Sequence, residues 1–382
     1  MRFGPALPLL LGGVLTLSAC VATTGDPAGV AVSSKDEACV LSSGTAPSGT
    51  ITFTVTNDGS DVTEFSLLAA DGLRVISELE NIGPGLTRDL VVQLAAGDYI
   101  AACKPGLVGD GIRSDFLVTD SGTPIATSGD RAAQRTEASE QYRLYVRDQV
   151  GTLAEKTDEF LEAYLAGDDE LARALYADTR VHWERIEPVA EAFGDLDPSM
   201  DAREADLIEG EPFTGWHHIE KTLWPPLEGY SLSADERREL ADQLAEDTAT
   251  LFDRVHAADF RIEPFQIGNT AKELLDELAS GKVTGEEEFW SHTDLWGFQA
   301  NLDGAWAAFS VLRPIVEQTD PALVEEIDRR FGELNALLAQ HGSIEDGFAF
   351  YDTLSPAEVL DLARAVDALG EPLSRLTAAA IA

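Results

Sequence analysis

Hydrophobic and polar residues alternate in the N-terminal part of the chain. The segment Ile51-Thr-Phe-Thr-Val55 has the period of two that is typical of a half-buried strand, and it runs into the turn signal Asn57-Asp58-Gly59, which predicts a hairpin. Further strand-like runs, separated by turn signals, lie at 64–68, 73–76, 90–94 and 99–102. Several short strands with regular turns indicate an all-β sandwich, which we place at residues 38–118.

The period changes to that of helices in the C-terminal part. Val146, Val150, Leu153, Phe160 and Tyr164 recur at spacings of three and four. Asp168 is placed to cap a following helix, whose apolar stripe we expect to include Leu171, Leu175, Ile186 and Phe193. Similar patterns occupy 234–258, 270–278, 303–316, 321–338 and 356–369. We therefore predict an all-α helical bundle at 136–382, joined to the sandwich by a linker at 119–135 that is rich in small and polar residues.

The first residues have the pattern of an export signal. Arg2 precedes an apolar stretch that is too short to span a membrane, and small residues come directly before Cys20. The four residues Leu17-Ser-Ala-Cys20 resemble a bacterial lipobox, which predicts a signal peptide at 1–19, lipidation of Cys20 and a flexible tether at 20–37. The alternative is an ordinary signal peptide with a chance cysteine. Either way we expect an exported protein, anchored to the outer face of the cytoplasmic membrane or lying in the periplasm.

The net charge and the number of cysteines limit the partners and the kinds of site that this chain can have. The chain has 68 acidic and 27 basic residues, a net charge of −41, which excludes nucleic acid as a partner. Such a surface attracts cations, although many acidic surfaces only confer solubility. With Cys20 lipidated, Cys39 and Cys103 remain. In an exported protein they are expected to form a disulfide, and a thiolate metal site is the alternative.

All six histidines of the chain lie in the helical half, so a site with imidazole ligands is expected there. The sandwich has no histidine and, without Met1, no methionine, so we predict that it binds no type 1 copper.

A pair of helical segments could hold a metal ion. His217 and Glu220, after the possible cap Thr214, are three residues apart and project from one helix face. A second predicted helix offers Glu184 and Glu187 with the same spacing, and Asp201 follows it. If the two helices are antiparallel neighbours, these side chains converge as a set suited to iron, manganese or zinc. The competing interpretation is a solvated face or a core ion pair.

His292 and Asp294 form a further candidate. They could add a ligand or orient a ligating imidazole, or His292 could be an inert helix cap. Peptidase signatures are absent, because there is no His-Glu-x-x-His motif and Lys221 stands where an inverted motif requires its second histidine.

Taken together, these motifs resemble a known family. The run from Arg180 to Pro198, followed by Asp201-Ala-Arg-Glu, Gly215-x-His217-x-x-Glu220-Lys-x-Leu-Trp and His292-Thr-Asp294-Leu-Trp, is similar to the imelysin-like domain of EfeO-type iron-uptake lipoproteins. The segments that begin at Glu78 and Cys103 resemble the cupredoxin-like domain of the same family. The resemblance extends over nearly the whole chain from Ala38.

The resemblance implies a cupredoxin-like sandwich followed by an imelysin-like bundle, in a protein that captures iron for an EfeUOB-type uptake system. Its partners would be a membrane ferrous-iron permease and a haem peroxidase. Iron is the implied metal, with zinc, manganese and copper as alternatives. The implied ligands are Glu184, Glu187, Asp201, His217 and Glu220, and a second metal site would involve Cys39, Glu64 and Cys103. An imelysin-type metallopeptidase is the competing function, and a polymer-binding surface module is a third.

Overall fold

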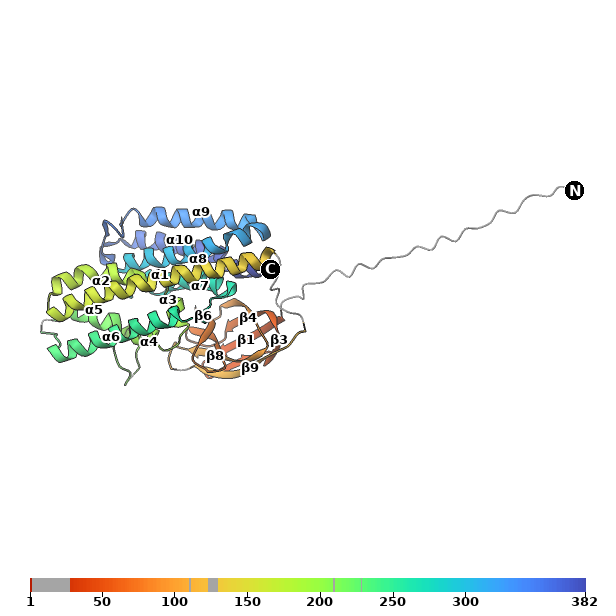
Figure 1. Cartoon of the computed structure of the whole chain (residues 1–382), viewed down its shortest axis with the longest axis horizontal. Helices are drawn as coiled ribbons and strands as arrows, with labels where there is room; N and C mark the ends of the chain where they lie inside the picture. Colours follow the sequence, from red (N-terminus) through yellow and green to blue (C-terminus); the bar gives the residue numbers. More distant parts are fainter. Residues whose placement is uncertain (2–27, 110, 123–129, 209, 228) are drawn as a thin grey trace.

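The computed structural model describes residues 1, 28–109, 111–122, 130–208, 210–227 and 229–382. A β domain at 28–119 lies against a helical domain at 130–381, in the predicted order (Figure 1). Residues 2–19 of the predicted signal peptide, and Cys20, lie outside the described residues.

The β domain is a sandwich of two mixed sheets. One sheet has the strand order β2-β1-β4-β7 and the other the order β3-β9-β8-β5-β6. The strands are β1 Ala28–Lys35, β2 Ala38–Leu41, β3 Thr45–Pro47, β4 Gly49–Asn57, β5 Thr63–Ala69, β6 Val75–Ile82, β7 Thr87–Leu94, β8 Gly97–Pro105 and β9 Ile112–Thr119. Every second side chain of β4 is buried, as its alternation predicts, and Phe53 packs on Phe65 and Phe116 between the sheets.

Two expectations about this domain are wrong. The sandwich begins at Ala28 and not at Ala38, because the predicted tether contains β1, in which Val30 and Val32 are buried and which pairs in parallel with β4. The turn after β4 does not close a hairpin, since β5 belongs to the opposite sheet. The buried amide of Asn57 explains this, because it donates to the carbonyl oxygens of Asp61 and Ile82, both at 2.7 Å, and fixes the crossing.

The helical domain is built around the long helix α1. Its elements are α1 Asp130–Ala166, α2 Asp169–Glu184, α3 Glu187–Glu191, α4 Asp197–Met200, η1 Glu204–Asp206, α5 Gly215–Leu223, α6 Ala234–His256, α7 Pro264–Glu277, η2 Leu278–Lys282, α8 Asp294–Thr319, α9 Pro321–Leu338, β10 Gly342–Ser343, β11 Gly347–Phe348, η3 Tyr351–Thr353, α10 Pro356–Leu373 and α11 Leu376–Ile381. Among the described residues, no helix combines the length and apolar character that crossing a membrane requires.

The helix pattern predicted most of these elements. Asp168 caps α2, as expected, by accepting the backbone N–H of Leu171. The expected apolar stripe is only partly correct, since Leu171 is exposed and Ile186 precedes a separate helix. Helix α1 starts at Asp130, inside the predicted linker.

The two domains share an interface in which α7 packs against β6 and β7 (Figure 1). The side-chain amide of Asn269 donates to the Ser77 hydroxyl at 2.8 Å and to the Val91 carbonyl at 3.1 Å. Phe265 of α7 and Ile381 of α11 also join the hydrophobic core of the sandwich. The β domain is therefore packed directly against the helical domain through α7 and α11.

Candidate metal centre

Helix α5 directs His217 and Glu220 to one buried face. Neither side chain is exposed, and Nδ1 of His217 lies 3.2 Å from Oε2 of Glu220. The other carboxylate oxygen of Glu220 accepts the backbone N–H groups of Trp290 at 3.0 Å and Ser291 at 2.7 Å. These bonds fix the carboxylate, so that one oxygen stays directed at the imidazole. Thr214 stands at the N-cap position but does not cap with its side chain.

A glycine brings Asp201 to the other side of the imidazole. Gly215 has a φ of 71°, and a Cβ there would lie 2.1 Å from the carbonyl oxygen of Met200. The start of α5 can therefore lie directly against the segment that ends α4. As a result, Oδ1 of Asp201 lies 3.3 Å from Nε2 of His217, while its other oxygen accepts the indole N–H of Trp183 at 2.5 Å.

Glu184 and Glu187 do not share a helix, contrary to the prediction. Helix α2 ends at Glu184 and α3 begins at Glu187, because Pro188 lacks the N–H that would bond to the Glu184 carbonyl oxygen. The side-chain amide of Asn301 in α8 donates to that carbonyl at 2.7 Å instead. Both carboxylates are buried near the centre, but neither contacts His217 among the contacts of the described residues.

Two buried glutamates that the sequence analysis missed complete the environment of His217. Oε1 of Glu287 lies 3.4 Å from Nε2 of His217, and Glu288 has a carboxylate oxygen within 4.8 Å of ligand atoms of His217 and Glu220. Both belong to the run Glu286-Glu287-Glu288, in which Glu286 is exposed. Three consecutive glutamates could have been recognised in the sequence as possible ligands. The run lies between regular elements, however, so no periodicity showed which of its members face inward.

Three groups of side chains are close enough to share an ion. Their ligand atoms lie within 4.8 Å of one another in the groups Asp201–His217–Glu287, His217–Glu220–Glu288 and Glu187–Asp197–Asp201. The first two groups share His217, whose Nε2 lies near Asp201 and Glu287 and whose Nδ1 lies near Glu220, and the first and third share Asp201. The predicted residues Asp201, His217 and Glu220 are thus brought together, Glu187 lies in the neighbouring group, and Glu184 is in none of the groups found among the described residues.

Two buried cations, also missed by the sequence analysis, lie among these acids. The Arg180 guanidinium pairs with Asp201 and Glu184, and its Nε lies 2.6 Å from Glu288. Lys282 Nζ lies among three further carboxylate oxygens, at 2.9 Å from Glu184, 3.7 Å from Glu187 and 3.9 Å from Glu287. These cations offset part of the repulsion among the carboxylates.

The protonation states follow from this packing. Burial alone lowers the pKa of His217, but hydrogen bonds to Asp201, Glu220 and Glu287 outweigh it and raise that pKa well above its ordinary value. Burial raises the pKa of Glu288 to about 8 despite the nearby Arg180. Burial acts in the same direction on Asp201, but there Arg180 and His217 prevail and lower the pKa. For Glu287, Lys282 and His217 likewise outweigh burial and lower the pKa.

Asp294 and His292 differ in their position relative to the candidate centre. Asp294 is fully buried and accepts the backbone N–H of Glu288 at 3.2 Å, and burial raises its pKa to about 7. His292 has a φ of 57° and forms a turn through its backbone, which bonds to Glu288 and Tyr351. It belongs to none of the three candidate groups in the described part of the chain, and the N-cap of α8 is Thr293. Asp294 therefore lies beside the centre, whereas the imidazole of His292 is not brought to it.

A cavity of about 800 Å³ leads from the domain interface to the centre. Its lining includes Glu187, Asp197, Asp201 and Glu287 from the helical domain, and Glu64 and Lys104 from the sandwich. An ion in this cavity would meet carboxylates from both domains.

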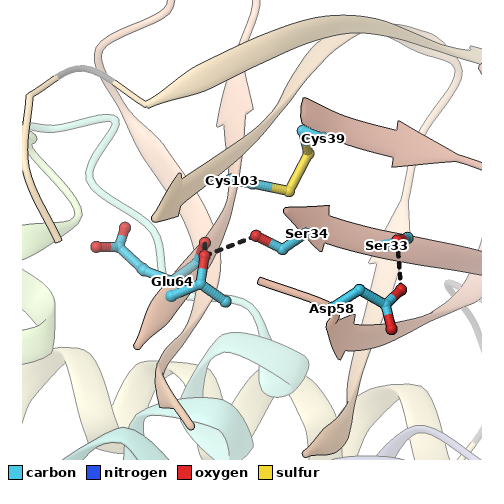
Figure 2. Close-up of a disulfide and its surroundings, with 7 residues drawn as sticks. Ser33, Ser34, Cys39, Asp58, Glu64 and Cys103 are labelled. Atoms are coloured by element: carbon cyan, nitrogen blue, oxygen red, sulfur yellow. Dashed lines mark hydrogen bonds between the residues drawn. A yellow bond between two sulfur atoms is a disulfide. The ribbon is translucent and has the colours of Figure 1, made fainter. Parts of the chain in front are cut away.

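The suggested second site in the sandwich is arranged differently. Cys39 and Cys103 form a disulfide with Cα atoms 5.5 Å apart, as predicted, so neither offers a thiolate to a metal ion. Figure 2 shows the Glu64 carboxylate directed away from this disulfide, and an oxygen of that carboxylate lies 3.5 Å from Lys104 Nζ. The three residues therefore do not form a ligand set in this structure.

Comparison with known proteins agrees with this architecture. The family model described as imelysin, of the M75 peptidase class, matches residues 138–376. A Yersinia pseudotuberculosis protein named iron uptake system component EfeO is 35% identical over 91% of this chain and 90% of its own length. An Escherichia coli O157:H7 protein of the same name is 35% identical over 94% of this chain and 93% of its own length.

A solved structure shows a likeness of fold alone. It is a Parabacteroides distasonis chain named as an iron-regulated protein A precursor, with a TM-score of 0.51 and 15% identity, and the match covers 64% of this chain and 95% of that one. The sequence relatives carry the assignment, because they are similar over nearly their full length. The chain belongs to the EfeO family of iron uptake system components, and its helical half is an imelysin domain.

Proposed function

We propose that this chain is the extracytoplasmic iron-binding component of an EfeUOB-type uptake system. The observation that carries the proposal is the gathering of four carboxylates, from Asp201, Glu220, Glu287 and Glu288, around the buried imidazole of His217. The names of its relatives point in the same direction.

The donor set suits the proposed cargo. Carboxylate oxygens with one imidazole nitrogen are ligands for iron and manganese, and less selectively for zinc, whereas the soft donors that favour copper(I) are missing from the three groups. We assign the cargo ion to an inner position beside His217, where neutral imidazole offers the ion one of its two nitrogens. The group of Glu187, Asp197 and Asp201 lines the cavity through which the ion would arrive.

A carrier explains the arrangement better than a peptidase does. A catalytic zinc site keeps a position for water beside a general base and usually has two or three neutral or thiolate donors. Here one imidazole is surrounded by carboxylates, and buried cations pair with several of them. We therefore propose binding and release of iron, with no hydrolytic step.

Location and partners complete the proposal. Lipidation at Cys20 would hold the chain at the outer face of the cytoplasmic membrane, where it could pass iron to a membrane permease, with a haem peroxidase acting in the same system. Cys20→Ser should release the full-length protein from membranes of the expressing cell, as measured by fractionation. A variant that stays membrane-bound would contradict the anchor.

Iron binding itself can be tested with the purified mature protein. Anaerobic titration with Fe²⁺ should show saturable binding, and His217→Gln should weaken it at least about tenfold, because even the loss of a group that only orients a ligand typically costs about 10- to 100-fold. His256→Gln is a matched control, because His256 is an exposed histidine of α6. Equal affinity of the wild type and the His217 variant would refute the assignment, and circular dichroism would show that the variant has kept its helices.

A further inference from the structure

Lys282 is an unusual residue to find inside a protein. It ends the short π-helical segment η2, and its side chain is only 1% exposed. Within the described residues its ammonium has ion pairs but no hydrogen bond of good geometry. A buried ammonium costs several kcal/mol unless nearby charges compensate for lost hydration. Its position is therefore maintained mainly by the charge of the surrounding carboxylates.

The fold provides space for this ammonium. Gly297 lies in the first turn of α8, where a Cβ would be 3.2 Å from Cε of Lys282 and 3.3 Å from the carboxylate carbon of Glu184. A glycine inside a helix costs about 1 kcal/mol relative to alanine. Here its lack of a side chain lets Lys282 and Glu184 meet against the helix backbone.

The carboxylates around Lys282 also belong to the candidate ion positions. Glu287 is a member of the inner group with His217, and Glu187 is a member of the group that lines the cavity. An ion bound at either position would share a carboxylate with the ammonium. Two cations that share one carboxylate in a buried site repel each other strongly, because the effective dielectric constant is low.

We propose that Lys282 is a fixed counter-cation that lowers the affinity of the centre for its cargo. This proposal rests on the proposed function, since it assumes that the centre binds a metal ion. The ammonium holds Glu184 and Glu187 together and competes electrostatically with an incoming ion. It thereby keeps binding weak enough for the ion to be released to a second protein.

Lys282→Gln tests the proposal, because glutamine removes the charge and keeps polar hydrogen-bonding groups. The matched control is Lys272→Gln on α7. Lys272 is also a largely buried lysine and pairs with Asp276, but it lines a different cavity that contains no candidate ligand. Affinity for Fe²⁺ under anaerobic conditions, and for Zn²⁺ as a redox-inert probe, would be measured by competition with a chelator. Thermal unfolding of the metal-free proteins would be measured in parallel.

We expect Lys282→Gln to bind both ions at least about tenfold more tightly than the wild type, as one fewer positive charge near the site implies. Lys272→Gln should stay within about twofold of the wild type. The metal-free Lys282 variant should melt at a lower temperature than the wild type and be stabilised more by Zn²⁺. Unchanged or weaker binding by Lys282→Gln would refute this proposal alone. Failure of the wild type to bind either ion would refute the proposed function, and this proposal with it.

Discussion

Metal binding at the inner position formed by His217, Glu220 and Glu288 should release a number of protons that follows from the structure. An ion bound beside His217 and Glu288 must displace the protons that these groups hold. Near neutral pH both are protonated in the metal-free protein, since the pKa of His217 is raised well above its ordinary value and that of Glu288 is raised to about 8. Asp201 and Glu287 have lowered pKa values and release none. We therefore expect about two protons per ion at pH 7.

The sign and size of the pH dependence follow from this number. Protons compete with the ion, so apparent affinity falls as the pH is lowered. Two protons per ion correspond to about 100-fold in affinity per pH unit, or about 2.7 kcal/mol. Above pH 8 the slope should decrease toward one proton, because Glu288 then ionises without the metal.

Calorimetric titration of Zn²⁺ in buffers of different ionisation enthalpy measures the released protons directly. His217→Gln and Glu288→Gln should each lower the number by about one at pH 7. A wild-type value near zero between pH 6 and 8 would refute the assigned protonation states. An unchanged value in the His217 variant would show that the ion binds elsewhere.

Three further perturbations test the scaffold. Replacing both Cys39 and Cys103 with serine should lower the free energy of unfolding by about 2–4 kcal/mol in a urea titration. The affinity for Fe²⁺ should not change, and a large loss of affinity would instead favour a metal site in the sandwich. Gly215→Ala should weaken Zn²⁺ binding at least about tenfold, because the added Cβ displaces the segment that holds Asp201. Gly167→Ala is the control and should leave binding unchanged, because Gly167 has a similar φ but no atom lies within 4 Å of the new Cβ. Asn301→Leu should destabilise the protein by about 1–3 kcal/mol in thermal unfolding, because a buried carbonyl oxygen at the end of α2 loses its donor; unchanged stability would mean that another group satisfies it.

Periodicity predicted the elements of this fold but not their pairing. The bounds of α9 were predicted at 321–338, as the structure has them, because a proline start and a regular apolar stripe are local signals. The strand β1 was assigned to the tether, although Val30 and Val32 alternate, because small residues around them suggested flexibility. Its partner β4 is about twenty residues away in sequence. Such a contact has no local signature.

In the candidate centre too, contacts between residues close in sequence were predictable, whereas contacts between distant segments were not. His217 and Glu220 were predictable because helical spacing alone brings them to one face. Their approach to Glu287 and Glu288 depends on how a segment outside regular helix folds back onto α5. Acids, imidazoles and thiolates are the side chains expected to bind a metal ion, so Arg180 and Lys282 were not among the predicted residues. Buried acids nevertheless need cations or protons to offset their repulsion.

Charge balance links these observations. At the inner position formed by His217, Glu220 and Glu288, a divalent ion that replaces the protons of His217 and Glu288 leaves the net charge of the centre unchanged. The surrounding ion pairs of Arg180 with Asp201 and of Lys282 with Glu184 then need no rearrangement to keep that balance. Exchange of this kind avoids the cost of burying a new charge, which would otherwise oppose binding. It also makes release sensitive to local proton concentration, because a proton returning to His217 competes with the ion for the nitrogen atom that the ion occupies.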